Sequence, residues 1–400
     1  MNPLNSVTKM LKNEQNIYLF YILIFSLATL HRLLLTDNAF NNFDIFRYSF
    51  FNLIQNNNLY TPYPDNYFDL FKYNPSFALL MAPFWIIPKI LGVLIWNLLN
   101  ALLPVYAINQ LQIKTSSKAF FSLFILIEML TSVQNAQSNG LMLGLMLLVF
   151  VFIEKNKIEK AALMMVLGLF IKIFAVGVAI MLVFKAAKKK FAIWGLTFGA
   201  LIGFSPGLII GFEPLKQQYM NWFQMLSSDK PHALNYSMMS FAERTLGIHW
   251  PQFYYLIAAF ILLALPLVRY KYFSNFSWRL IYLAAILIWV VVFNHKSESP
   301  TFVIATAGVA LWFIASKKNI YRWVLLFIVL IFTTLSSTDL FPQLVRENYM
   351  KPYAIKVLPC ILLFFTAIYD LLFENHFDTK YLLDQQLSDI KEEDSLHEII

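Results

Sequence analysis

Residues 161–190 read AALMMVLGLFIKIFAVGVAIMLVFKAAKKK, an apolar run that Lys172 interrupts and a lysine cluster ends. The run is long enough to cross a hydrocarbon core about 30 Å thick. Lysines also precede it, and basic residues of membrane proteins gather in cytoplasmic loops. Both flanks therefore belong to one side, which predicts two half-helices that reverse near Lys172. Non-helical backbone at that depth needs surrounding protein or a water-filled cavity.

The rest of the 400-residue chain has the same apolar character. It is 59% hydrophobic and 14% charged, against about 25% charged residues in soluble proteins. This composition excludes soluble kinases, Rossmann dehydrogenases and secreted disulfide scaffolds. We predict an all-α integral membrane protein, a polytopic helical bundle with about 10–12 membrane segments. Besides 161–184, the apolar stretches are 17–30, 77–110, 119–133, 140–153, 191–211, 252–268, 280–293, 301–315, 323–336 and 353–372.

The connecting segments differ in their content of Lys and Arg. With a cytoplasmic N-terminus, the segments on the inside hold 17 basic residues in 55 positions, and those on the outside hold 9 in 114. This bias has the direction expected for a membrane protein. Three long outer segments, 36–76, 212–251 and 337–356, are expected to be extracytoplasmic and to carry short amphipathic helices. Ordered loops of this kind favour an enzyme at the membrane surface.

Acidic residues concentrate at the C-terminus. Residues 373–400 hold eight Asp or Glu and two lysines, which leaves the rest of the chain at +14. We therefore predict a membrane domain over 1–372 and an acidic cytoplasmic tail over 373–400. The positive charge of the body suits anionic membrane lipids, and nucleic acid is not an expected partner.

Asp44 is the first candidate for chemistry. It lies in FDIFRY with Tyr48 four residues later, on the same face of a short helix. Aromatic neighbours would lay this helix on the bilayer surface. Partial desolvation there can raise the pKa of a carboxylate toward that of a useful base. The alternative is a structural ion pair with Arg47 or a local hydrogen bond.

Two ionisable residues, Glu128 and Lys172, fall inside apolar stretches. Each costs about 2.5–3.5 kcal/mol at a helix centre on insertion scales, so such residues face a bundle interior or a cavity. They are expected either to pair with each other or, for Lys172, to contact an anionic ligand.

Two polar patches follow apolar stretches. In FNHKSESPTF, His295 and Lys296 could donate to phosphate oxygens, although a solvated turn is the commoner outcome. Gln137 and Asn139 belong to an amide-rich patch that could bind sugar hydroxyls or form turns and caps. The six histidines lack the spacing of a zinc helix, and no Walker A or dinucleotide motif is present. No metal or cofactor is expected.

Several of these motifs together resemble glycosyltransferase family 87, over most of the first 310 residues. The resemblance rests on an ordered series of short motifs: Asp44 with Tyr48, Leu59-Tyr60, Tyr73 with Pro75, Gln137 with Asn139, Lys172 after an apolar half-helix, and Asn235 with Ser237.

The resemblance implies a GT-C fold and a polyprenyl-phosphate sugar donor, typically a mannose donor. It also implies that Asp44 is the general base. A sugar phosphate already carries a good leaving group, so one carboxylate and several cations would suffice. Tyr48 would orient the base or the sugar, and single displacement would invert the anomeric carbon. The residues expected to bind substrate are His295, Lys172, Lys296, Arg244, Gln137, Asn139, Asn235 and Tyr73.

We therefore expect an inverting hexosyltransferase that transfers to a glycan or glycolipid hydroxyl. It would lie in a membrane, with a bacterial inner membrane as the expected location, both termini cytoplasmic and the active site extracytoplasmic. One rival is a secondary transporter or lipid flippase that uses Glu128 and Lys172 as a coupling pair. A second rival is a multispan scaffold that tolerates neutralisation of Asp44.

Overall fold

The computed structural model describes residues 13–36, 39–183, 185–228 and 235–374. The structure is 78% helical, and none of the described residues forms a strand. The predicted all-α class is therefore confirmed. From residue 375 on, the predicted acidic tail lies outside the described residues.

Six helical segments of the described chain are long and apolar enough to cross a membrane, and α7 with α8 adds a seventh if that pair, bent by 43°, is one span. Three further apolar segments are shorter, at 10–17 residues. The chain is thus a multi-pass integral membrane protein. The expected number of about 10–12 membrane segments stays a prediction. The six segments are Glu14–Leu35, Lys89–Asn109, Lys188–Ile210, Gln252–Ser274, Ile320–Ser337 and Ile355–Phe373.

Several of these helices present large apolar side chains outward. Leu196 on α12 (Lys188–Phe204) is 75% exposed, and Leu23 on α2 (Glu14–Leu35) is 59% exposed. A helix that is apolar all round and exposed suits contact with lipid rather than water.

The chain divides into two compact units, and α2, α6 (Lys89–Asn109) and α8 (Leu126–Gln134) cross the boundary. Unit 1 comprises residues 1–19, 108–128 and 233–400, and unit 2 comprises 20–107 and 129–232. The predicted single domain over 1–372 stays a prediction.

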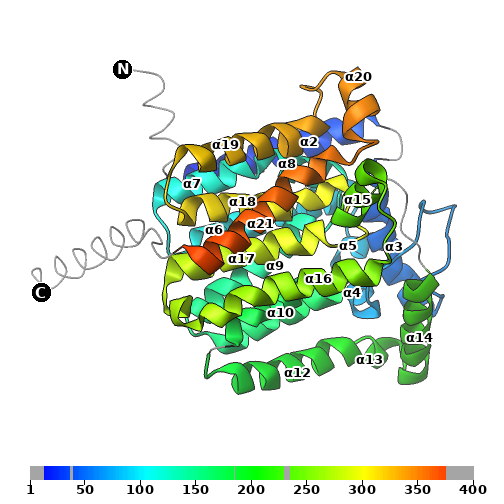
Figure 1. Cartoon of the computed structure of the whole chain (residues 1–400). Helices are drawn as coiled ribbons and strands as arrows, with labels where there is room; N and C mark the ends of the chain where they lie inside the picture. Colours follow the sequence, from blue (N-terminus) through cyan, green and yellow to red (C-terminus); the bar gives the residue numbers. More distant parts are fainter. Residues whose placement is uncertain (1–12, 37–38, 184, 229–234, 375–400) are drawn as a thin grey trace, which may run out of the picture. The chain divides into compact units, whose positions relative to one another are not determined.

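Unit 1 is built around two apolar helices that are almost wholly buried, α17 (Phe276–Val292) and α18 (Phe302–Ala315). They lie side by side, and α21 (Leu358–Phe373) packs against both (Figure 1). A Cβ on Gly308 would lie 2.7 Å from the carbonyl oxygen of Ala284, so glycine permits this close approach. The remaining helices of unit 1 are α7 (Thr115–Phe124), α15 (Met238–Leu246), α16 (Gln252–Ala264), η2 (Leu265–Ser274), η3 (Ser299–Thr301), α19 (Ile320–Val329), η4 (Leu330–Thr334), η5 (Leu335–Ser337), α20 (Gln343–Val345), η6 (Arg346–Met350) and η7 (Ile355–Val357).

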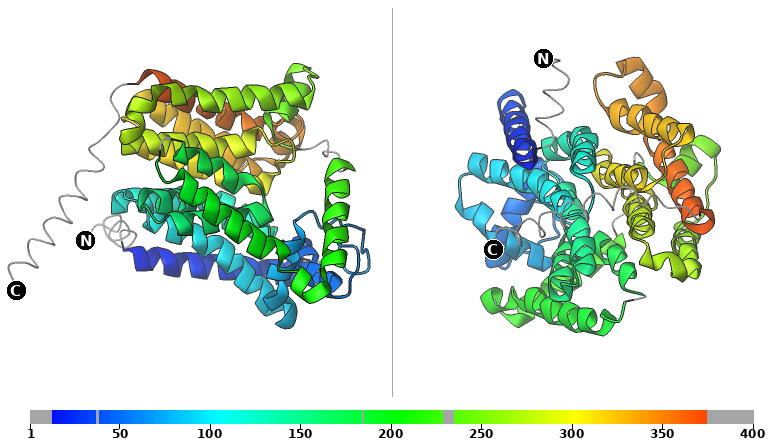
Figure 2. Two further views of the ribbon diagram at one scale, coloured as in Figure 1. Left: turned by 90° about the horizontal axis from the view of Figure 1, so that it is seen from below. Right: turned by 90° about the vertical axis from the view of Figure 1, so that its left-hand side faces the viewer.

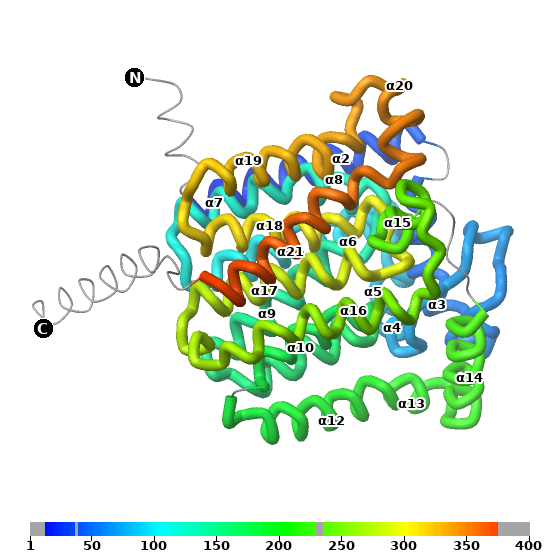
Figure 3. The backbone as a smooth tube through the Cα atoms, in the orientation of Figure 1, coloured from blue at the N-terminus to red at the C-terminus, as the bar shows by residue number. Residues whose placement is uncertain are grey.

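The loops of unit 1 gather at its two ends as the basic-residue pattern predicts. At one end, Nζ of Lys356 donates to the hydroxyls of Ser299 and Ser337, so segments 294–300 and 337–356 meet there. At the other end, Arg322 binds Asp370, which joins the start of α19 to the end of α21. Figure 3 traces the chain from α19 through α20 back into α21.

Unit 2 is centred on α9 (Asn139–Glu154), which is buried along most of its length. A Cβ on Gly140 would lie 2.3 Å from the carbonyl oxygen of Asn100 on α6, so this pair of helices packs backbone to backbone. The other helices of unit 2 are α3 (Asn41–Ile54), α4 (Pro75–Leu80), α5 (Ala82–Ile86), α10 (Ile158–Ile171), α11 (Phe174–Val178), η1 (Ala179–Leu182), α12, α13 (Gly207–Ile210) and α14 (Phe212–Ser228).

The reversal predicted near Lys172 is present. Helix α10 ends at this residue, whose backbone is extended, and the chain returns through α11, which packs against α10. The return brings Lys185 to 3.6 Å from Glu154 and Lys190 to 3.2 Å from Glu159. Segments 154–160 and 185–190 therefore share one end of unit 2, and α12 then runs beside α10 (Figure 2).

Candidate active site

Asp44 occupies the first turn of α3 in unit 2. Its neighbour Phe40 caps the helix in a left-handed conformation, φ 69°. The Asp44 residue is 8% exposed, and Nζ of Lys89 lies 2.6 Å from its Oδ2. Burial raises the pKa of Asp44 above its ordinary value, and the bond from Lys89 opposes that rise. The site thus couples a partly desolvated carboxylate to one ammonium.

The alternative expectation is an ion pair between Asp44 and Arg47. The partner is wrong, because Lys89 forms the ion pair with Asp44. The Arg47 guanidinium instead donates to the carbonyls of Phe84, Trp85 and Ile87 and lies 5.0 Å from the centroid of the Trp85 ring. It fixes α5 beside α3 and leaves Lys89 as the cation bonded to Asp44.

Tyr48 lies one turn beyond Asp44. Its ring centroid is 5.4 Å from that of Trp85 and 6.2 Å from that of Tyr67. These rings form an aromatic wall along α3. The role of Tyr48 in orienting the base or the sugar stays a prediction.

The expectation that the aromatic neighbours of Asp44 lay α3 on the bilayer is wrong for Phe43 and Phe46. Both are buried inside unit 2, as is Ile45 between them. The Phe46 ring contacts Tyr73 at 5.0 Å and Trp96 at 5.4 Å between centroids. These side chains fill the core beneath Asp44, because α3 packs against α4 and α5.

Four other predicted residues gather in a polar cluster of unit 2. Nζ of Lys172 donates to Oδ1 of Asn139 at 2.6 Å, and Nδ2 of Asn139 donates to Oε1 of Gln137 at 2.6 Å. The Tyr73 hydroxyl lies 3.3 Å from that of Ser138. The carbonyl of Asn135 accepts from Asn42 at the start of α3, so this cluster and Asp44 share one end of unit 2.

The predicted pairing of Glu128 with Lys172 is wrong. Glu128 binds Lys356, 2.8 Å away and 228 residues later in the chain, and both residues are buried in unit 1. A buried carboxylate needs a cation close by, and the fold supplies one from η7, just before α21.

The predicted residues of unit 1 also lie together. Nδ2 of Asn235 donates to the carbonyl of His295 at 2.7 Å, and Nδ1 of His295 lies 2.8 Å from Nε2 of Gln252. Arg244 donates to the carbonyl of Asn235 and, at 2.9 Å, to that of Lys351. Lys296 follows in the same loop, its N–H bonded to Oδ1 of Asn294 at 3.0 Å.

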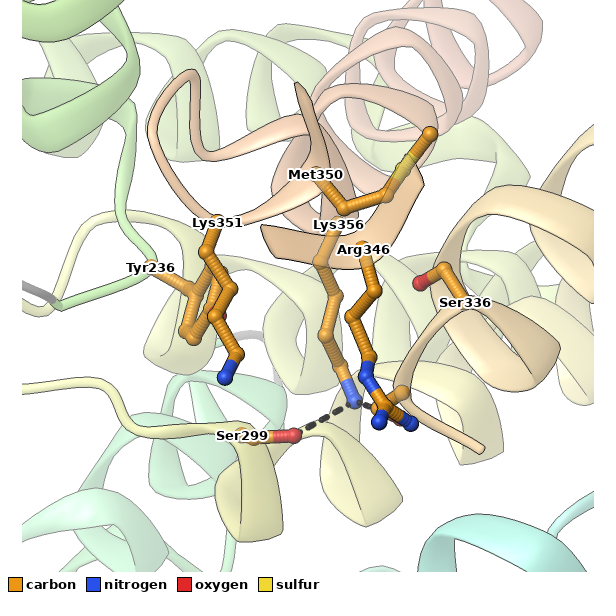
Figure 4. Close-up of a pocket in the computed structure, with 8 residues that line it drawn as sticks. Tyr236, Ser299, Ser336, Arg346, Met350, Lys351 and Lys356 are labelled. Carbon is orange, nitrogen blue, oxygen red and sulfur yellow. Dashed lines mark hydrogen bonds between the residues drawn. The ribbon is translucent and has the colours of Figure 1, made fainter. Parts of the chain in front are cut away.

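A cavity of about 250 Å³ opens beside this group in unit 1 (Figure 4). Three basic side chains and three serine hydroxyls contribute to its wall. Its lining residues are Tyr236, Ser299, Ser336, Ser337, Arg346, Met350, Lys351 and Lys356.

The sequence reasoning missed the charged part of this cavity. Arg346, Lys351 and Lys356 were assigned only to an external loop. The sequence does contain a signal for this basic group. The segments expected outside are poor in Lys and Arg, and these three residues are three of the nine that they hold. Lys89, the partner of Asp44, was also missed. Among the residues that the structure describes, no three His, Cys, Asp or Glu side chains gather as metal ligands would.

The fold and these sites define a polytopic helical membrane protein whose polar loops bring buried carboxylate, amide and basic groups together in each unit. The sequence model of glycosyltransferase family 87 matches residues 71–338, about two thirds of the chain. The chain belongs to this family and is a glycosyltransferase, so it uses a sugar donor and an acceptor. No curated protein sequence matches it. Asp44 and Tyr48 precede the matched segment, and the other eight predicted site residues fall within it.

Proposed function

We propose that this glycosyltransferase moves a hexose, with mannose as the first candidate, from a polyprenyl phosphate to a hydroxyl of a glycan or glycolipid. The observation that carries the proposal is the buried Asp44 carboxylate bonded to Lys89 in an outer segment rich in aromatic residues. An enzyme with at least six candidate membrane-spanning segments in the described part of the chain suits a donor that is itself a lipid.

In the proposed reaction, Asp44 accepts the proton of the acceptor hydroxyl. The acceptor oxygen then forms a bond to the anomeric carbon while the bond from that carbon to the phosphate oxygen breaks. The phosphate leaves with the bonding electrons, so it needs no general acid, and the sugar inverts. Basic side chains offset the negative charge that develops on the phosphate.

The predicted binding residues divide between the units, and each set is proposed on its own contacts. In unit 2, Lys172 would contact the phosphate while Gln137, Asn139 and Tyr73 bind hydroxyls of the sugar. The Lys172–Asn139–Gln137 chain of hydrogen bonds supports this set, because it fixes the lysine and the amides to each other.

In unit 1, His295, Lys296 and Arg244 would contact phosphate, and Asn235 would hold their loop in place. The bonds of Asn235 to His295 and of Arg244 to Asn235 support this arrangement. Burial lowers the pKa of Arg244 and so disfavours its charge, which an anionic ligand would compensate.

The proposed orientation places both termini in the cytoplasm and the active site outside, in a bacterial inner membrane. The fourfold excess of basic density in the segments assigned inside supports it. Segments assigned to one side also meet at one end within each unit.

The transporter or flippase alternative is not favoured, because it relies on a Glu128–Lys172 pair that the structure does not contain. It predicts flux that depends on a proton or sodium gradient and no release of polyprenyl phosphate.

The test is incubation of the purified protein, in liposomes with a lipid extract as acceptor, with a panel of radiolabelled polyprenyl-phosphate hexoses. We expect labelled product and equimolar polyprenyl phosphate from one donor, without any ion gradient. Nucleotide-linked hexoses serve as the control. Consumption of a nucleotide sugar instead would refute the donor class, and gradient-driven flux without product would favour the transporter.

A further inference from the structure

The cavity of unit 1 gathers three basic side chains at the end of two membrane-spanning segments. The span Ile320–Ser337 ends at its wall, and the span Ile355–Phe373 begins there. Side chains of Arg346, Lys351 and Lys356 converge above Ser299 (Figure 4). Groups at the ends of membrane spans lie near the level of lipid headgroups.

The inner wall of the cavity carries hydroxyls in a fixed orientation. Nζ of Lys356 is neutralised by Glu128 and also donates to Ser299 at 2.8 Å and to Ser337 at 3.0 Å. A hydroxyl that accepts from an ammonium must turn its own hydrogen elsewhere. Ser299 can therefore donate into the cavity, whose wall it forms.

On the outer wall, two carboxylates already pair with the two cations. The Glu347 carboxylate lies 2.7 Å from Nζ of Lys351 and 3.7 Å from Nε of Arg346, and Oδ1 of Asp339 lies 2.9 Å from Nη1 of Arg346. The hydrogen bond from Lys351 keeps the pKa of Glu347 below its usual value. All four side chains are at least partly exposed, and exposed ion pairs contribute little to stability. A better anion can therefore displace Glu347 and Asp339 at small cost.

A phosphate group suits this wall better than a carboxylate. It offers three acceptor oxygens instead of two and forms charge-assisted bonds with arginine and lysine. The volume of about 250 Å³ is roughly eight times that of one liquid water molecule, so it admits a hydrated headgroup rather than a whole glycolipid. Arg346 and Glu347 belong to the π-helical turn Arg346–Met350. Turns of this geometry are frequent at functional sites.

We propose that this cavity binds the phosphate of a lipid-linked phosphate ester through Arg346, Lys351 and Ser299. The phosphate displaces the carboxylates of Glu347 and Asp339 from these cations. The choice of a polyprenyl phosphate as that lipid rests on the proposed function. Arg346 and Lys351 lie beyond residue 338, where the match to the family ends, whereas Ser299 lies within the match. The two cations of this site therefore come from outside the matched part of the chain.

The test is binding of radiolabelled polyprenyl monophosphate to the purified full-length protein and to three charge variants. Arg346→Gln removes one charge-assisted bond and should weaken binding about tenfold or more. Glu347→Gln removes one of the two competing carboxylates and should tighten binding several-fold, a gain that a merely structural role would not produce. Lys317→Gln is the matched control, since Lys317 is exposed at the opposite end of unit 1, and should bind like the wild type.

Competition identifies the source of the phosphate. Displacement by unlabelled polyprenyl phosphate but not by phosphatidylglycerol vesicles supports the carrier lipid, and displacement by both supports a general lipid-phosphate site. Equal affinity of all three variants, or displacement by inorganic phosphate at the concentration at which unlabelled polyprenyl phosphate acts, overturns the proposal.

Failure of this inference and failure of the proposed function give different results. Protein that binds the lipid with the expected variant pattern but transfers no hexose contradicts the function and leaves the cavity assignment standing. Hexose transfer with the same KM and the same lipid affinity in Arg346→Gln and Glu347→Gln contradicts the cavity assignment and leaves the function standing.

Discussion

At Asp44, a single lysine decides how strongly the carboxylate holds its proton. Burial favours the neutral acid, whereas Lys89 at 2.6 Å favours the carboxylate. A general base must be ionised before it can act, so the balance of these two effects sets the pH at which the enzyme becomes active. The raised pKa places that transition above the ordinary range of an aspartate.

Replacing Lys89 with Met should move the acidic limb of the pH profile of kcat/KM to higher pH. Without the ammonium, only the charge of Arg47 opposes the effect of burial. The pKa of Asp44 therefore rises further, and the base stays protonated up to a higher pH. The expected displacement is about one to three pH units. Lys216→Met, at a lysine with 69% of its side chain exposed, is the control. An acidic limb that stays in place in Lys89→Met would show that Asp44 is not the titrating base.

At this scale, the sequence predicted which residues are unusual but not what they touch. Asp44, Glu128 and Lys172 stand out because each is a charge among apolar or aromatic neighbours. Their partners come from elsewhere in the chain, Lys89 at 45 residues from Asp44 and Lys356 at 228 from Glu128. Such pairings depend on helix packing, which no local pattern encodes.

Among the helices, close packing at glycines holds the core of unit 2 together. Gly140 sits against the backbone of Asn100, and Gly168 sits against Ala175 where the chain reverses after α10. The reversal itself was predictable because lysines mark both flanks of the apolar run and Lys172 marks its middle. The contact of Gly140 was not predictable, since Asn100 is 40 residues away in the sequence.

Gly140→Ala should lower the stability of the protein by about 1–3 kcal/mol, because its Cβ would meet the Asn100 carbonyl at 2.3 Å and backbone cannot yield as a side chain can. Gly199→Ala on α12 is the matched control, since no atom lies within 4 Å of its added Cβ. Alanine there should stabilise the helix by about 0.5–1 kcal/mol. Thermal unfolding in detergent measures both, and equal midpoints for the two variants would contradict this packing.

For the whole molecule, the lengths of the apolar stretches and the counts of basic residues predicted the class, a multi-pass helical membrane protein. Within each unit, connecting segments that those counts assign to the same side meet at the same end. The three short apolar segments explain why the number of crossings was harder to predict. Two of them form the core of unit 1 and one the core of unit 2, and buried helices need not match the bilayer thickness. Sequence hydropathy alone cannot distinguish such helices from lipid-facing ones.

The orientation can be tested with single cysteines at the two ends of unit 2. Cys360 is fully buried, so the native thiol should not react. Asp65→Cys lies in an exposed part of the outer segment 36–76, and Lys189→Cys lies in the basic segment 185–190. A membrane-impermeant maleimide should label the first in intact cells and the second only after permeabilisation. The reverse pattern would invert the proposed topology.

The central claim is that Asp44 is the base of a hexosyltransferase, and the rate of transfer by Asp44→Asn tests it most directly. Asp65→Asn, at an exposed aspartate of the same segment, is the matched control for the loss of one charge. We expect kcat of Asp44→Asn to fall by about 10²–10⁴-fold while its expression and thermal stability stay close to those of the wild type. Asp65→Asn should keep full activity. Transfer by Asp44→Asn at the wild-type rate would contradict the claim.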